Sequence, residues 1–205
     1  MIQKDERRRY ASDLSDSQWA IIAPLFPRAG NRNKWEKREL VDAVLYFVDN
    51  GCKWRNLPHN FPPYTTVANF YYAAIRSGLW EKILAALVER VRTDAGQNAG
   101  PSYAIIDSQS VKTTSCSEEC GIDGGTKGRK RHIVVDVMGN LLAVAVHAAN
   151  IHDTKGGIFT AQQAFGQYPS IQKFCADTGY RGTFVSDVQE QLGLDGQGLE
   201  AVPIG

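Results

Sequence analysis

Apolar residues recur at helical spacing through the first half of the chain. The clearest pattern covers residues 40–48, where apolar side chains repeat every three or four positions and Gly51 follows as a stop signal. Similar patterns predict three more helices, over residues 15–26, 65–77 and 80–91. The first half is therefore predicted to form a small helical domain, residues 1–98.

Small polar residues mark where two of these helices begin. Ser15 or Asp16 precedes the apolar residues of the first helix, and Thr65 or Thr66 precedes those of the third. Side chains of these types accept hydrogen bonds from the free N–H groups of a first helical turn. We therefore expect them to be N-cap residues.

The second half changes to short apolar runs that alternate with helical patterns. Residues 94–102 are small and polar, and we place the boundary between two domains in this segment. Strands are predicted over residues 103–107, 132–137, 141–147, 171–176 and 199–203, and helices over 154–165 and 183–192. Three strands followed by alternating helices and strands favour a mixed sheet in residues 99–205, covered by helices on both faces.

Composition narrows the class of protein. The chain of 205 residues is 43% hydrophobic and 22% charged, which is typical of a soluble globular protein. No apolar stretch follows the charged N-terminus, and the most apolar region, residues 133–149, is interrupted by Asp136 and Gly139. We therefore expect a cytoplasmic protein with no membrane partner.

Two acidic residues follow predicted buried strands. Asp107 comes after an apolar run at 104–106, and Asp177 comes after a similar run at 174–176. If these strands are neighbours, the two carboxylates lie side by side and repel one another unless a cation separates them. A divalent metal held in this way supports phosphodiester chemistry on DNA or RNA. The alternative is that both aspartates only begin loops, as this residue often does.

Five stretches of the chain have the order and spacing of motifs from one enzyme family. They are residues 51–58 (GCKWRNLP), 105–112 (IIDSQSVK), 127–132 (KGRKRH), 150–153 (NIHD) and 176–182 (ADTGYRG). Together they resemble DDE transposases of the insertion-sequence-five type, and the similarity covers nearly the whole chain. The resemblance implies a fold of the α+β or α/β class, with a helix-turn-helix-like N-terminal domain followed by a ribonuclease-H-like mixed-sheet domain.

The same resemblance implies roles for the acids. Asp107 and Asp177 would be the first two acids of a catalytic triad and would hold Mg²⁺ or Mn²⁺. The third acid of the family is a Glu on a helix after the fifth strand. This chain ends at Gly205, just after that strand, and Glu190 and Glu200 occupy other positions. We therefore expect no third catalytic acid in this chain, and a C-terminally truncated sheet domain that lacks its last helix.

Residues for DNA contact are predicted in both domains. In the helix over 65–77 they are Asn69, Tyr72 and Arg76, because a helix end presents N–H groups to phosphate and its side chains reach base edges. An ordinary core helix is the alternative. In the sheet domain the candidates are mostly cationic residues, with a solvated loop as the alternative for the cluster at 127–132. These candidates are Lys112, Lys127, Arg129, Lys130, Arg131, His132 and Arg181.

The predicted function is DNA transposition. The resemblance implies binding to the terminal inverted repeats of an insertion element and, in a complete protein, cutting and rejoining of DNA by two-metal phosphodiester transfer. The expected partners are these repeats and the target DNA, and the pairing of two DNA ends favours a homo-oligomer. Two alternatives remain, which are a catalytically inactive DNA-binding fragment that regulates transposition and a metal-dependent nuclease.

Overall fold

The computed structural model divides the chain into two compact units, Met1–Leu87 and Val88–Gly205. The residues that it describes are 9–26, 34–113, 120–123, 125–176, 180, 183–194 and 199–201. The division between the units falls within a helix, whereas the sequence places the domain boundary at residue 98.

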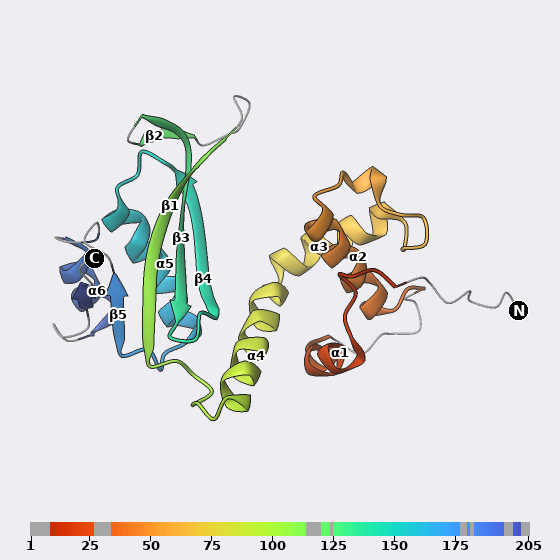
Figure 1. The fold of residues 1–205 in the computed structure, drawn as a ribbon, viewed down its shortest axis with the longest axis horizontal. Coiled ribbons are helices and arrows are strands. Elements are labelled where there is room, and N and C mark those ends of the chain that lie inside the picture. The colour runs from red at the N-terminus through yellow and green to blue at the C-terminus, as the bar shows by residue number, and fades with distance from the viewer. Residues whose placement is uncertain are drawn as a thin grey trace, which may run out of the picture. The chain divides into compact units, whose positions relative to one another are not determined.

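Helices make up the first unit, as the apolar pattern predicts (Figure 1). They are α1 (Asp16–Ile22), the short 3-10 helix η1 (Ala23–Leu25), α2 (Lys37–Asn50), η2 (Trp54–Asn56), α3 (Tyr64–Arg76) and the first turns of α4 (Leu79–Asp94). Ser15 caps α1 in a capping box with Gln18, and Gly51 ends α2 with a φ of +58°. The structure places the N-cap of α3 at Pro63 without a side-chain hydrogen bond, so the prediction of a threonine cap is wrong.

The core of the first unit is centred on α2, because apolar side chains lie on two faces of this helix. Val41 packs in one cluster with Ile22 of α1 and Ile83 of α4. A second cluster joins α2 to the following loop and to α3 through the buried residues Leu40, Ala43, Val44, Leu57, Phe61 and Val67. The inner face of α3 is thereby held against α2, and the opposite face of α3 is exposed.

A mixed sheet dominates the second unit, as predicted (Figure 1). Its strands are β1 (Tyr103–Lys112), β2 (Gly121–Asp123), β3 (Thr126–Asp136), β4 (Leu141–Ala148), β5 (Lys173–Ala176) and β6 (Leu199–Ala201). The sheet runs β2-β3-β1-β5-β6, and β4 pairs with β3. β3 is antiparallel to β1, β2 and β4, whereas β1, β5 and β6 are parallel. The short strand β2 is not foreseen in the sequence, and both β1 and β3 are longer than predicted.

Helix α5 (Asp153–Gln167) covers one face of this sheet, and α6 (Thr183–Leu192) packs against α5. Alternation along β1 explains the choice of face, because Ala104 and Ile106 are buried while Ile105 between them is 37% exposed. On β4 the side chains of Val144 and Val146 are also exposed. In the part of the chain that is described, helices therefore cover one face and not both.

The turn between β3 and β4 is fixed by a buried carboxylate. Asp136 Oδ1 accepts hydrogen bonds from the backbone N–H groups of Met138 and Asn140, each at 2.9 Å. Its Oδ2 atom lies 2.6 Å from Nη1 of Arg92, in the last turns of α4. The last part of α4 is thus tied to the end of the sheet. None of the helices in the described ranges is long and apolar enough to cross a membrane.

Candidate active site

Asp107 lies in the middle of β1 and not at its end, because the strand continues to Lys112. Its side chain is exposed, and one carboxylate oxygen accepts a hydrogen bond from the N–H group of Ser108 at 2.7 Å. The residue lines an open cavity of about 350 Å³ together with Ser108, Gln109, Arg131 and Ile133. The first predicted acid is therefore accessible from solvent, on the sheet face that α5 does not cover.

The parallel pairing of β1 and β5 ends directly before the two predicted acids. Ile106 of β1 pairs with Ala176 of β5, and both side chains are buried. Asp107 and Asp177 are the next residues in the sequence. Asp177 lies outside the described residues, as does Arg181. The register thus confirms that the two strands are neighbours, and places the residues that precede the acids side by side.

The predicted cationic cluster is divided by strand alternation. Since residues 127–132 belong to β3, successive side chains point to opposite faces of the sheet. Lys127 and Arg131 are exposed and Arg129 is half-buried, and the Arg131 guanidinium donates a hydrogen bond to the Gln109 side chain. These residues share the face of Asp107. Lys130 and His132, on the other face, are 5% and 0% exposed.

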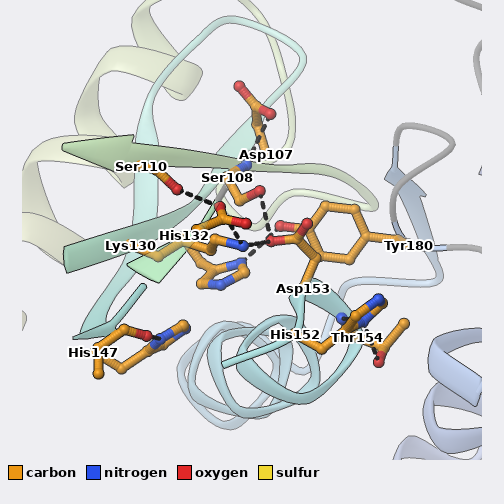
Figure 2. Close-up of polar contacts among 12 residues, drawn as sticks. Asp107, Ser108, Ser110, Lys130, His132, His147, His152, Asp153, Thr154 and Tyr180 are labelled. Carbon is orange, nitrogen blue, oxygen red and sulfur yellow. Dashed lines mark hydrogen bonds and ion pairs between the residues drawn. The ribbon is translucent and has the colours of Figure 1, made fainter. Parts of the chain in front are cut away.

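Lys130 binds carboxylates of its own chain, which corrects its predicted contact with phosphate. Its Nζ atom lies 3.0 Å from Asp123 Oδ2 and 3.0 Å from Asp153 Oδ1. Ser108 and Ser110 donate hydrogen bonds to these same oxygens, at 2.9 Å from Asp153 and 2.7 Å from Asp123. Figure 2 shows this network on one side of β1, with the Asp107 carboxylate on the other.

The charges of this network stabilise one another. Burial acts to lower the pKa of Lys130, but its hydrogen bonds and ion pairs with Asp153 and Asp123 outweigh burial and raise this pKa above 10.5. The hydrogen bonds from Ser110 and Lys130 lower the pKa of Asp123. Lys130 therefore stays cationic and is compensated inside the protein. The network ties β1, β2 and β3 to the start of α5.

The prediction that His132 contacts DNA is also wrong, because its ring is enclosed in the protein. Nδ1 lies 2.7 Å from the Tyr180 hydroxyl oxygen, and the ring centroid lies 4.8 Å from that of His147. Burial, with a smaller effect of His147, lowers the pKa of His132 from 6.5 to about 4. At neutral pH this histidine is uncharged. The aromatic ring of Tyr180 packs in the interior and is not available to stack on DNA.

The DNA-contact candidates on α3 lie along one exposed stripe. Asn69, Tyr72 and Arg76 are exposed, and their spacing of three and four residues places them on the same helix face. By contrast, Tyr71 is half-buried and packs near Trp54 and other aromatic rings. α3 therefore contributes one face to the core and leaves the predicted contact residues open to a partner. In the second unit Lys112, at the end of β1, is exposed as well.

Comparison with known proteins adds to this geometry. A family model described as "Putative transposase of IS4/5 family" matches residues 14–84, and one described as "Transposase DDE domain" matches residues 98–195. The chain belongs to the DDE transposases of insertion sequences. The mixed sheet of this transposase is accordingly a ribonuclease-H-like fold.

Two curated relatives resemble parts of this transposase. An uncharacterized protein, y4sN, of Sinorhizobium fredii is 30% identical over 103 residues, which are 48% of this chain and 75% of the relative. The insertion element IS402 uncharacterized 16.2 kDa protein of Burkholderia cepacia is 23% identical over 119 residues, or 53% of this chain and 78% of that protein. The second relative is thus itself assigned to an insertion element.

Metal binding by this transposase would need acids beyond those described around the cavity. Within the described ranges, no group of three His, Cys, Asp or Glu side chains is arranged to hold a metal ion. The cavity does present side-chain oxygens, in Asp107 and in the neighbouring Gln109. Carboxylate oxygen is the donor that Mg²⁺ and Mn²⁺ prefer, so the chemistry of the exposed residue fits the family's ions.

Sequence reasoning missed the residues that support this site. Gln109 lies beside Arg131 in the cavity, and Asp153 accepts the contacts of Ser108 and Lys130. The period of two in β1 and β3 is the signal that separates the exposed from the buried residues. This alternation can be recognised only when β1 and β3 are given the full lengths that they have in the structure.

Proposed function

We propose that this transposase binds the terminal inverted repeats of its insertion element and contributes Asp107 and Asp177 to the site that cuts and rejoins DNA. The observation that carries the proposal is the parallel pair Ile106–Ala176, which directly precedes both acids. The exposed position of Asp107 beside a cavity supports it, because a catalytic carboxylate needs access to the DNA backbone.

The two aspartates would hold Mg²⁺ or Mn²⁺ between them. Two carboxylates that lie side by side on neighbouring strands repel one another, and a divalent cation removes that repulsion. When bound, such ions activate an attacking oxygen and stabilise the leaving oxygen of a phosphodiester. The protein's part is to hold both carboxylates in fixed positions and to orient the phosphate against them.

Cations on the face of Asp107 would hold the DNA backbone near the acids. Lys127, Arg129 and Arg131 follow one another on this face of β3, and Arg131 borders the same cavity as Asp107. We include Arg181 in this proposed contact because it lies a few residues beyond Asp177, and Lys112 because it is exposed at the end of β1, although alternation places it on the other face of the sheet. Such contacts are with phosphate, so they would position DNA without reading its sequence.

The first unit would recognise the DNA ends as a helix-turn-helix-like domain, with α3 in the major groove. Asn69, Tyr72 and Arg76 form its exposed stripe. Asn and Arg side chains make the paired hydrogen bonds that distinguish adenine and guanine in this groove. Joining two element ends to a target DNA requires two such domains, so we propose a homo-oligomer as the acting form.

The test uses the full chain and DNA duplexes tiled across the sequences that flank its gene. We expect specific binding to duplexes from the element ends. We also expect Asp107→Asn and Asp177→Asn each to abolish the Mg²⁺- or Mn²⁺-dependent cutting of those ends. Asp94→Asn, an exposed carboxylate on α4, is the matched control and should behave as wild type. Arg76→Ala should weaken end binding by about tenfold.

Three outcomes would contradict parts of this proposal. Cutting that survives Asp107→Asn removes the assignment of that acid. Equal affinity for end and unrelated duplexes, together with cutting of both, identifies a metal-dependent nuclease. Specific end binding, with no cutting under any of these conditions, identifies a DNA-binding regulator of transposition.

A further inference from the structure

Strand β4 lies at an edge of the sheet (Figure 1). It pairs antiparallel with β3 on one side, and no strand of the described part of the chain pairs with its other side. An edge strand presents backbone N–H and C=O groups that have no partner in the sheet. The outer side of β4 is therefore a place where another strand can join the sheet.

The pairing with β3 determines which backbone groups of β4 face outward. The N–H group of Ala149 donates to the carbonyl oxygen of Gly128, its direct partner across the ladder. Hydrogen-bonded and non-hydrogen-bonded residues alternate along an antiparallel strand. Val146 and Val144 are an odd number of residues before Ala149, and the one shift in the register lies before Val144. The backbone groups of these two valines therefore point away from β3.

β4 lacks the features that protect edge strands from pairing. Protected edges are very short, or carry charged residues or proline. β4 is eight residues long, and its sequence LLAVAVHA contains no proline and no Asp, Glu, Lys or Arg. The side chains of Val144 and Val146 are 49% and 57% exposed on the sheet face that α5 does not cover. The strand thus combines outward backbone groups with an uncovered apolar surface.

We propose that β4 pairs antiparallel with β4 of a second copy of this chain, about a twofold axis at Ala145. In this register Val144 of one copy exchanges both backbone hydrogen bonds with Val146 of the other, and the axis repeats the exchange. Ala145 faces Ala145 of the second copy, and such small side chains allow close approach. A second copy fits this edge because an uncharged strand meets itself without like charges opposite one another.

The charges beside β4 also fit this arrangement. In the β3–β4 register Arg131 lies beside Val146, and Ile133 lies beside Val144. Pairing two copies then places Arg131 of one copy in the same row as Ile133 of the other, so the two arginines do not face each other. The strands at the ends of the sheet order, β2 and β6, have three residues each and offer little edge for further pairing. The assembly therefore closes as a dimer.

This pairing would place both candidate sites on one side of a continuous sheet. The twofold axis between two antiparallel strands is perpendicular to the sheet, so a residue on one face lies on the same face in both copies. Asp107 of each copy would lie on the shared open face with Arg131. The role of the dimer, which is to hold two DNA ends side by side, rests on the proposed function. The pairing itself needs neither DNA nor metal.

The first test measures self-association of the full chain by analytical ultracentrifugation, without DNA or metal. One strand pair buries less surface than the about 1,200–2,000 Å² of stable interfaces, so we expect a dissociation constant in the micromolar range. Val144→Lys with Val146→Lys sets lysine opposite lysine in the pair and should raise this constant by about tenfold or more. Val111→Lys with Val137→Lys is the matched control, because it adds the same charge at exposed valines outside β4 and should dimerise like wild type.

A cysteine substitution tests the register. Ala145 and Ala145 of the second copy form a non-hydrogen-bonded pair, whose Cα atoms lie about 4.5 Å apart and within reach of a disulfide. Ala145→Cys should therefore give a covalent dimer under mild oxidation, in excess of any that the native cysteines form in the wild-type chain. Ala143→Cys is the matched control, because Ala143 faces His147 of the second copy and should crosslink no more than wild type.

The outcomes separate this inference from the proposed function. A wild-type chain that stays monomeric throughout the micromolar range, or equal crosslinking of Ala145→Cys and Ala143→Cys, overturns the β4 pairing. An unaltered dimer in the double lysine variant of β4, or growth into open-ended assemblies, also overturns it. If the pairing fails while specific binding to element ends persists, the proposed function stands. If the pairing holds and the chain binds end and unrelated duplexes equally, only its role in holding DNA ends is lost.

Discussion

Replacing Arg92 by methionine removes the cation that faces a buried carboxylate. Arg92 Nη1 lies 2.6 Å from Asp136 Oδ2, and the two side chains are 5% and 0% exposed. Water therefore cannot take the place of the guanidinium. Methionine retains much of the arginine's apolar stem, so the loss of charge dominates the effect.

The expected loss of stability is about 3 kcal/mol. Removal of one partner from a buried ion pair costs about 3–5 kcal/mol. We take the lower end because Asp136 keeps its hydrogen bonds from Met138 and Asn140. Burial acts to raise the pKa of Asp136, but hydrogen bonds from Asn140 and Arg92 outweigh it and hold the pKa below 3.8.

That pKa fixes the pH dependence of the variant. Because the pKa of Asp136 is lower in the folded than in the unfolded protein, its contribution to stability is present above pH 3.8 and is lost as the pH falls through the folded value. Arg92→Met raises the folded pKa. The difference between variant and wild type should therefore shrink in acid.

The assay must report the second unit separately. Cys175 of β5 is 4% exposed, so its labelling by a thiol reagent in increasing urea follows unfolding of that unit. All four tryptophans lie within residues 1–87, and their fluorescence follows the first unit. The matched control is Arg90→Met, because Arg90 pairs with Asp94 on the same helix with both side chains 58% exposed. That pair is worth at most about 0.5 kcal/mol.

Equal losses for Arg92→Met and Arg90→Met at neutral pH would refute this reasoning. The double variant Arg92→Met with Asp136→Asn gives a second check. Since it removes the uncompensated charge as well, it should be more stable than Arg92→Met alone.

Two further predictions concern the packing beneath the site. Gly156→Ala should destabilise the second unit by about 1–3 kcal/mol, because the new Cβ would lie 2.1 Å from His147 Nε2 and 2.4 Å from His132 Nε2. Gly166→Ala, in the same helix, places its Cβ where nothing lies within 4 Å and should stabilise the unit by about 0.5–1 kcal/mol. Similar effects of the two substitutions in the Cys175 assay would contradict this prediction. Since burial lowers the pKa of His132 to about 4, its neutral form stabilises the fold above pH 6.5, and on the order of 3 kcal/mol should be lost between pH 6.5 and about 4. His132→Asn should remove most of that loss, and an unchanged pH profile in this variant would count against the assignment.

Periodicity predicts most elements of this fold because each obeys a local rule. Apolar spacing locates α2, and the short apolar run before Asp107 locates the start of β1. Ser15 and Gly51 act through their own backbone neighbours, so their roles at helix ends are also readable. The three-residue strand β2 has too few residues to show a pattern.

The surroundings of the site are less predictable, since they depend on partners distant in sequence. The sequence indicates that Lys130 belongs to a cationic cluster, but its carboxylate partner Asp153 lies on another element, α5. His132 and Tyr180 are 48 positions apart and meet because both side chains lie against α5, at Gly156 and Gly157. Residue type therefore indicates the chemistry of the acids, while the roles of buried polar residues follow from the tertiary fold.

The central claim is that Asp107 and Asp177 share one divalent-metal site. Fe²⁺ enters Mg²⁺ sites with oxygen ligands, and with ascorbate and peroxide it cuts the polypeptide close to where it is bound. Mass spectrometry of the Fe²⁺-treated full chain should find cuts near both residues 107 and 177, suppressed together by excess Mg²⁺ and lost together in Asp107→Asn. Cuts near one acid alone, or cuts near residue 177 that persist in Asp107→Asn, would contradict the claim.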